Sequence, residues 1–238
     1  MTLHQRMVVA IDGPAASGKS STARWVAERL GFRHVDSGAL YRAVTWLAVR
    51  EAGNPERWSD DAVRPLADRV MLAPIQGSFE PVVDGAGAGE VIRGTDVTQH
   101  VSRVAQLPSV RDWVNERVRA AGGEHDVVVD GRDIGTVVFP DAPLKVFLVA
   151  DPWERARRRL IQRLGRRPAE DEIAEETERL VERDAQDATQ TVQARDAVLL
   201  DTTFLTQPEQ VERIVALAHA VTHRGDDTSS VDERERAR

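Results

Sequence analysis

The sequence contains no cysteine, and only two of its 32 basic residues, Lys19 and Lys145, are lysines. The absence of cysteine excludes disulfides, thiolate metal ligands and cysteine nucleophiles. No apolar stretch reaches membrane-spanning length and no N-terminal segment has the pattern of a signal peptide, so we expect a cytoplasmic protein that does not bind membranes. A basic excess is also lacking: the net charge is −7, which argues against a general nucleic-acid-binding protein.

The chain of 238 residues has 41% hydrophobic side chains, which is enough for the core of one α/β domain with small insertions. We predict one domain over residues 1–224. Residues 225–238 are polar and charged with one isolated valine, which favours a disordered tail. We expect the protein to act as a monomer.

Short apolar runs alternate with helical patterns along the chain. This alternation predicts an α/β fold with a doubly wound parallel sheet of about five strands. Strand-like pieces between glycine-rich turns predict a small β-containing insertion at about 66–105, and a basic helical segment at about 155–170 is predicted to form a lid. The main strands are expected near residues 7–11, 35–36, 127–130, 144–149 and 198–201. The strand-like pieces of the insertion lie near residues 70–72, 80–83 and 91–92, and the last helix is expected at 208–223.

The clearest motif lies between the first strand and the first helix, where residues 13–20 match G-x-x-x-x-G-K-[ST] in full. In such a P-loop the backbone N–H groups and the helix N-terminus surround phosphate oxygens. Lys19 would reach the β- and γ-phosphates, and Ser20 would be a ligand of Mg²⁺. The predicted phosphate-binding residues are Gly13, Pro14, Ala15, Ala16, Ser17, Gly18, Lys19, Ser20, Ser21 and Thr22.

The P-loop indicates that the protein binds a nucleoside triphosphate, but it does not show which reaction follows. The [NT]-K-x-D element of regulatory GTPases is absent, and motors or helicases are larger. A small-molecule kinase with ATP as donor is the favoured interpretation. A kinase for another acceptor, such as UMP, and a nucleotide-binding regulator with slow ATP hydrolysis remain alternatives.

Charged residues follow several of the predicted strands, where open α/β sheets bind ligands. Ser37 is expected to cap the helix that carries Arg42, whose guanidinium could bind a phosphate with two hydrogen bonds. Asp130 ends a buried strand, which is a common place for the acidic residue that organises the water shell of a metal ion. Arg132 and Asp133 follow at once, and burying these charges requires partners for each of them.

Four stretches together resemble the bacterial cytidylate kinase family, a group of P-loop nucleoside monophosphate kinases. They are the P-loop, residues 36–42 (Asp-Ser-Gly-Ala-Leu-Tyr-Arg), residues 130–142, which begin Asp-Gly-Arg-Asp-Ile-Gly-Thr, and residues 182–184 (Glu-Arg-Asp). The resemblance covers about residues 7–220, and the stretch after Asp130 is the most specific. It implies transfer of the γ-phosphoryl group of ATP, with Mg²⁺, to CMP or dCMP.

The resemblance also implies a role for individual residues. It assigns Ser37, Arg111 and Asp133 to the cytosine ring, Ser102, Arg183 and Asp187 to the sugar, and Arg42 and Arg132 to the acceptor phosphate. Cytosine presents an amino donor and ring acceptors, which suit a carboxylate and an arginine. The chain departs from the family pattern at Gln190, where a further arginine is usual, and Arg195 is a candidate substitute.

Arginines crowd the predicted lid between residues 155 and 167. A nucleic-acid patch and a solvated helix face are alternatives for this stretch. The favoured interpretation is a lid that brings arginines to the transferring phosphate and excludes water. The predicted catalytic residues are Lys19, Arg132, Arg155 and Arg159, and the predicted metal site is Ser20 with Asp130.

Overall fold

A computed structural model describes residues 6–236, and the side chains up to Thr222. The predicted alternation of strands and helices is confirmed. The elements are β1 (Val8–Asp12), α1 (Lys19–Leu30), β2 (Arg33–Asp36), α2 (Ser37–Glu51), α3 (Asp60–Ala67), β3 (Val70–Ile75), β4 (Ser78–Val83), β5 (Ala86–Gly87), α4 (Thr95–Val104), α5 (Pro108–Glu124), β6 (Val127–Asp130), β7 (Leu144–Val149), α6 (Pro152–Leu164), α7 (Glu170–Asp187), β8 (Val198–Asp201) and α8 (Gln207–Arg236).

The sheet has the strand order β3-β4-β2-β6-β1-β7-β8. The five adjacent strands β2, β6, β1, β7 and β8 are all parallel, as expected of a doubly wound fold. The insertion does not form a separate sheet. Instead β4 pairs with β2 in parallel through His34 and Val35, and β3 and β5 pair antiparallel with β4.

One predicted strand of the insertion is wrong. Val91 and Ile92 lie in a short 3₁₀ turn, Gly89–Arg93, rather than in a strand. Ile92 is almost fully buried in the core, whereas Val91 is exposed. The two apolar residues therefore do not pack as a strand that is buried on both faces, and the flanking Gly89 and Gly94 favour a turn.

The two faces of the sheet pack against different helices. Alternate residues of β2 and β6, such as Val35 and Val129, pack in one core cluster with α2, α3 and α5. Val128 faces the opposite side, where it packs with residues of α1 and α8. This alternation follows from the period of two along a strand. It fixes which side chains at the strand ends can meet.

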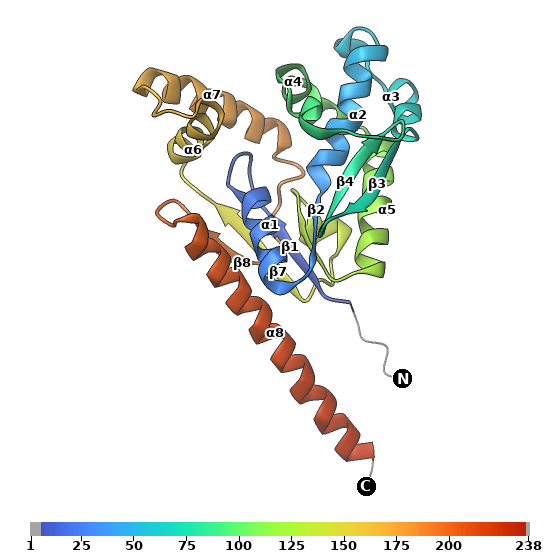
Figure 1. The fold of residues 1–238 in the computed structure, drawn as a ribbon, viewed down its shortest axis with the longest axis vertical. Coiled ribbons are helices and arrows are strands. Elements are labelled where there is room, and N and C mark those ends of the chain that lie inside the picture. The colour runs from blue at the N-terminus through green and yellow to red at the C-terminus, as the bar shows by residue number, and fades with distance from the viewer. Residues whose placement is uncertain (1–5, 237–238) are drawn as a thin grey trace.

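The carboxyl ends of the parallel strands form one edge of the molecule. In Figure 1, α2 and α4 rise above this edge on one side and α6 and α7 on the other. Asp12, Asp36 and Asp130 are the last residues of β1, β2 and β6 and share this edge. The expected site therefore lies between two groups of helices.

The C-terminal helix differs from its prediction. Helix α8 continues to Arg236 through residues for which a disordered tail was predicted, and residues 237 and 238 lie outside the described part. A single glycine at position 225 costs only about 1 kcal/mol in a helix interior, and no proline follows to end the helix. Among the described helices, none is both long enough and apolar enough to cross a membrane.

Candidate active site

The P-loop joins β1 to α1 and has the backbone that its glycines permit. Gly13 and Gly18 have φ angles of 150° and 86°, and Ala16 is also left-handed at 56°. A Cβ atom on Gly13 would lie 2.2 Å from the Leu148 carbonyl oxygen of β7. Glycine is therefore required at this position for the loop to pass so close to the neighbouring strand.

Lys19 is the first residue of α1, and its side chain is buried. Its ammonium group donates to the Pro14 carbonyl oxygen at 2.9 Å, across the loop. Burial, together with the nearby charge of Arg132, lowers the pKa of Lys19 to about 7, although Asp130 opposes the shift. The amine thus lies at the centre of the loop in a place that favours an arriving anion.

Ser20 and Asp130, the predicted metal site, are brought together across the sheet. The Ser20 hydroxyl donates to Asp130 Oδ2, and His34 Nε2 lies 2.7 Å from Asp130 Oδ1. Burial alone would raise the pKa of Asp130, but the contacts with His34 and Ser20 outweigh it and hold the pKa below its ordinary value. A hydroxyl and an ionised carboxylate at the base of a phosphate loop suit Mg²⁺, which prefers oxygen ligands and retains several waters.

Two residues of α6 and α7 hold the P-loop from the other side. The Asp184 carboxylate accepts from the Ala15 backbone N–H at 2.9 Å. Arg155 donates to the Ala15 carbonyl oxygen at 2.7 Å, to Asp184 at 2.6 Å and to the Ala150 carbonyl at 3.1 Å. Arg155 therefore supports the loop. Arg155 was predicted to contact the transferring phosphate. The structure instead places it on the inward face of the first turn of α6, where its side chain is buried and bonded to the P-loop.

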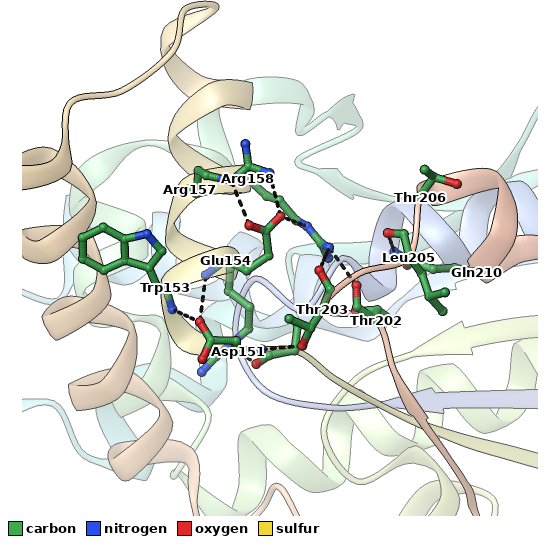
Figure 2. A network of polar contacts seen from close by, with 12 residues as sticks. Asp151, Trp153, Glu154, Arg157, Arg158, Thr202, Thr203, Leu205, Thr206 and Gln210 are labelled. Atoms are coloured by element: carbon green, nitrogen blue, oxygen red, sulfur yellow. Dashed lines mark hydrogen bonds and ion pairs between the residues drawn. The ribbon is translucent and has the colours of Figure 1, made fainter.

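A cavity of about 1180 Å³ lies over the P-loop. It is lined by P-loop residues, by arginines of α6 that include Arg159, and by the loop after β8. Figure 2 shows Arg158 reaching from α6 to the carbonyl oxygens of Thr202 and Thr203, at 2.7 and 2.8 Å, while Glu154 accepts from both Arg157 and Arg158. The loop after β8 is thus bound to α6 at one end of the cavity.

Thr22 was predicted to bind phosphate, but its side chain is buried beneath the loop. Its hydroxyl is fully buried, donates to Gln210 Oε1 of α8 at 2.9 Å and accepts from Gln207 at 3.1 Å. Ser21, in contrast, is exposed and lines the cavity. Thr22 therefore joins α1 to α8, and only its backbone N–H remains close to the loop.

The residues predicted for the acceptor phosphate and sugar are brought together opposite the P-loop. Arg132 Nε is 3.3 Å from Asp187 Oδ2, and Arg183 Nε is 3.8 Å from the same oxygen. Arg183 Nε is buried and has no hydrogen-bond partner among the described residues. Arg42, on α2, donates to the Thr98 hydroxyl of α4 at 3.1 Å. Ser102 is a buried residue of α4.

These cations perturb one another. Burial, together with repulsion from Arg132 and Arg42, lowers the pKa of Arg183 to about 9. Burial likewise lowers the pKa of Arg42 to about 10; Asp36 opposes the shift, and the charges of Arg93, Arg159 and Arg132 add to it. Neighbouring positive charges that are removed from water favour the binding of an anion between them.

Arg111 and Asp133, predicted for the base, form an ion pair, and Arg111 also donates to the Ala105 carbonyl oxygen at 3.0 Å. Burial raises the pKa of Asp133 although Arg111 opposes the shift.

The predicted cap at Ser37 is wrong. Asp36 caps α2 by accepting from the Ala39 N–H at 3.0 Å, and the Ser37 hydroxyl donates to the Asp130 carbonyl oxygen.

Sequence reasoning missed several residues that build the site. Asp12 accepts from the backbone N–H groups of Ile134 and Gly135 at 2.9 and 2.8 Å and so holds the loop that carries Asp133. Burial raises the pKa of Asp12 to about 6. Its position at the end of β1 was a usable signal, and Asp184 belongs to the Glu-Arg-Asp stretch at residues 182–184 that resembles the family, whereas nothing in the sequence indicated the role of His34. Gln190 donates its N–H to the Asp187 carbonyl in a turn, and Arg195 is exposed.

A phosphate loop after the first strand, faced across the strand ends by partly buried arginines from other segments, defines a P-loop kinase. The model of the family described as cytidylate kinase matches residues 9–220, so the chain belongs to the cytidylate kinase family. A cytidylate kinase of Limosilactobacillus fermentum is 45% identical over 212 residues, which cover 87% of this chain and 92% of that protein. One of Chloroherpeton thalassium is 40% identical over 226 residues, covering 91% and 95%.

Proposed function

We propose that the protein transfers the γ-phosphoryl group of ATP to CMP or dCMP, giving ADP and CDP or dCDP. The observation that carries this proposal is the group of buried and partly buried cations between the P-loop and the acceptor residues. Lys19, Arg42 and Arg183 all have lowered pKa values because burial and mutual repulsion disfavour their charges. Two phosphate groups that approach from opposite sides would relieve that repulsion.

ATP fits the cavity over the P-loop, with its phosphates on the backbone N–H groups of the loop and its base toward the loop after β8. Lys19 would then exchange its contact with the Pro14 carbonyl for phosphate oxygens. Ser20, with Asp130 behind it, would hold Mg²⁺, which supplies charge neutralisation on the phosphates. Arg159 lines the same cavity and is the remaining lid candidate for the transferring group.

The acceptor lies on the other side of the cations. Arg42 and Arg132 would bind its phosphate, and Asp187, Arg183 and Ser102 its sugar. A phosphate oxygen of CMP attacks the γ-phosphorus in line, a new P–O bond forms, and the bond to the β-phosphate oxygen of ADP breaks. The acceptor phosphate is already ionised at neutral pH, so the reaction requires no general base. The chain contributes position and charge.

Base recognition is the sharpest test of this assignment. If Asp133 accepts a hydrogen bond from the cytosine amino group, its carboxylate would face a carbonyl oxygen of UMP and reject it. Asp133→Asn should lower kcat/KM for CMP by about ten- to a hundredfold, because a hydrogen bond to a charged group contributes roughly 1.5–3 kcal/mol. It should raise the preference for UMP relative to CMP, whereas Arg111→Ala should weaken both without reversing their order.

The experiment measures ADP release with CMP, dCMP, UMP, AMP and no acceptor, for the unaltered protein and both variants at saturating ATP and Mg²⁺. Equal rates with and without acceptor would indicate a nucleotide hydrolase and refute the kinase. A CMP-to-UMP ratio that is the same in Asp133→Asn as in the unaltered protein would refute the role of Asp133 in base recognition.

A further inference from the structure

His34 is a buried histidine that the proposed reaction does not use. It lies in the middle of β2, is only 3% exposed, and is paired in register with Val128 of β6. Residues 34 and 36 point to the same face of the sheet, and Val128 on that face packs in the apolar cluster with α1. An apolar side chain would fit position 34 without desolvating a polar group. The histidine therefore carries a cost that one particular contact must offset.

That contact is with Asp130. The carboxylate lies diagonally across the β2–β6 pair from His34, at the reach of a long side chain. His34 Nε2 and Asp130 Oδ1 are 2.7 Å apart, and both side chains are nearly excluded from solvent. Because an ionised carboxylate only accepts hydrogen bonds, Nε2 must carry the proton and donate it. The second oxygen of Asp130 accepts from the Ser20 hydroxyl.

We propose that His34 is a positioning residue for Mg²⁺: by fixing one oxygen of Asp130 it directs the other oxygen toward Ser20 and the P-loop. This inference rests on the proposed function, since it assumes that Ser20 and Asp130 form the metal site. A carboxylate held at one oxygen cannot rotate about its terminal bond, so its second oxygen keeps a fixed direction. Residues that hold metal-site groups in this way typically change metal affinity by about 10–100-fold when altered.

The test uses two amide variants that differ only in reach. His34→Gln places an N–H donor near the position of Nε2, whereas the shorter His34→Asn cannot span the distance to Asp130. His34→Leu removes the donor and keeps the apolar volume. Val128→Ala is the matched control, because it removes packing beside His34 on the same face and leaves the Asp130 contacts in place.

The readout is ADP binding by calorimetry with and without Mg²⁺, which requires no turnover. The dissociation constant without Mg²⁺ divided by the dissociation constant with Mg²⁺ reports how strongly the metal ion contributes to ADP binding. We expect this ratio to fall about tenfold in His34→Asn and His34→Leu, and to remain within about threefold of the unaltered protein in His34→Gln. Val128→Ala should lower the melting temperature and leave the ratio unchanged.

An unchanged ratio in folded His34→Asn or His34→Leu would refute the proposal and leave His34 as a packing residue. If His34→Leu does not fold, the comparison of Gln with Asn decides, and equal ratios in these two would also refute it. A ratio near one in the unaltered protein would instead refute the metal site itself. Failure of CMP as acceptor, with a normal Mg²⁺ ratio, would refute only the proposed reaction.

Discussion

The two halves of the site are held in different ways. On the donor side, the P-loop is a continuous backbone segment fixed by Asp184, Arg155 and Gln210, which bond to the loop and to the first turn of α1. On the acceptor side, charged side chains from separate segments bond mainly to one another, as Arg132 does with Asp187. The donor side is therefore ordered without a ligand, whereas the acceptor side has paired charges that a substrate must separate.

This difference predicts which changes affect chemistry and which affect folding. Contacts on the donor side connect the loop to the core, so their loss should lower stability. Ion pairs on the acceptor side keep several cations close together, so their loss should affect binding more than folding. The predictions that follow test this contrast, beginning with the largest expected effect.

The largest effect is expected at Lys19. Lys19→Ala should lower kcat by about 10²–10³-fold, because it removes a preorganised cation from the transferring phosphate. Its unfolding free energy should stay close to that of the unaltered protein, since among the described residues the ammonium donates a hydrogen bond to the Pro14 carbonyl alone. Steady-state kinetics with varied ATP provide the measurement. A rise in KM with kcat unchanged would contradict the role, because it would indicate uniform binding only.

The comparison of Arg155 with Arg132 tests stability on the two sides directly. Arg155→Ala leaves the Ala15 and Ala150 carbonyls unpaired and should lower the free energy of unfolding by about 2–3 kcal/mol, less than a fully buried pair because Asp184 is partly exposed. Arg132→Ala should lower it by less than about 1 kcal/mol, since the loss of an ion pair is offset by relief of repulsion with Lys19 and Arg183.

Urea unfolding of both variants measures the difference. The contrast between the two halves fails if Arg132→Ala is the more destabilising of the two. Steady-state kinetics give the complementary measurement, because Arg132→Ala should raise KM for the acceptor.

A third contrast concerns protons. Because burial lowers the pKa of Lys19 to about 7, we expect the amine to be largely uncharged at pH 8 before nucleotide binds and phosphate to restore its proton. Binding of ADP with Mg²⁺ should therefore take up close to one proton at pH 8 and weaken as pH rises above 7. Lys19→Arg should bind without that uptake, because guanidinium stays charged. Calorimetry in buffers of different ionisation enthalpy counts the protons, and an uptake of zero in the unaltered protein would contradict the lowered pKa.

The smallest effect is expected from the far end of α8. Val221 is the last described residue of α8 that packs against the core cluster shared with α1. Removal of residues 224–238 should leave both kcat/KM and the melting temperature unchanged within error. A drop in melting temperature of several degrees would mean that the end of the helix stabilises the fold.

The donor half could be predicted from sequence because it is contiguous. The P-loop motif, its flanking strand and its helix lie within residues 7–30 and were located correctly. The acceptor half came from resemblance to a family rather than from spacing. The supporting contacts were invisible, because each joins residues far apart in the chain: 96 positions separate His34 from Asp130, 169 separate Ala15 from Asp184, and 188 separate Thr22 from Gln210.

Ser37 and Arg155 illustrate a second limit. Serine is a common helix cap, but Asp36 precedes it and its carboxylate reaches the Ala39 N–H first. Arg155 belongs to a run of arginines that sequence cannot divide into inward and outward positions without the register of α6 against the P-loop. Local propensity identifies the residue types that can cap a helix or bind a phosphate. Which of several such residues does so depends on tertiary contacts, which the local sequence does not show.

The scarcity of lysine has a practical consequence for chemical labelling. Lys145 is held by Asp196 and by the Pro140 carbonyl oxygen, so its amine is engaged. Burial lowers the pKa of Lys19 to about 7, and its amine lies beside the cavity over the P-loop. Among the side chains of this protein, an amine-reactive reagent that carries a phosphate group therefore meets one nucleophile at the centre of the P-loop. Protection of that amine by ATP would then report nucleotide occupancy at a single residue by mass spectrometry.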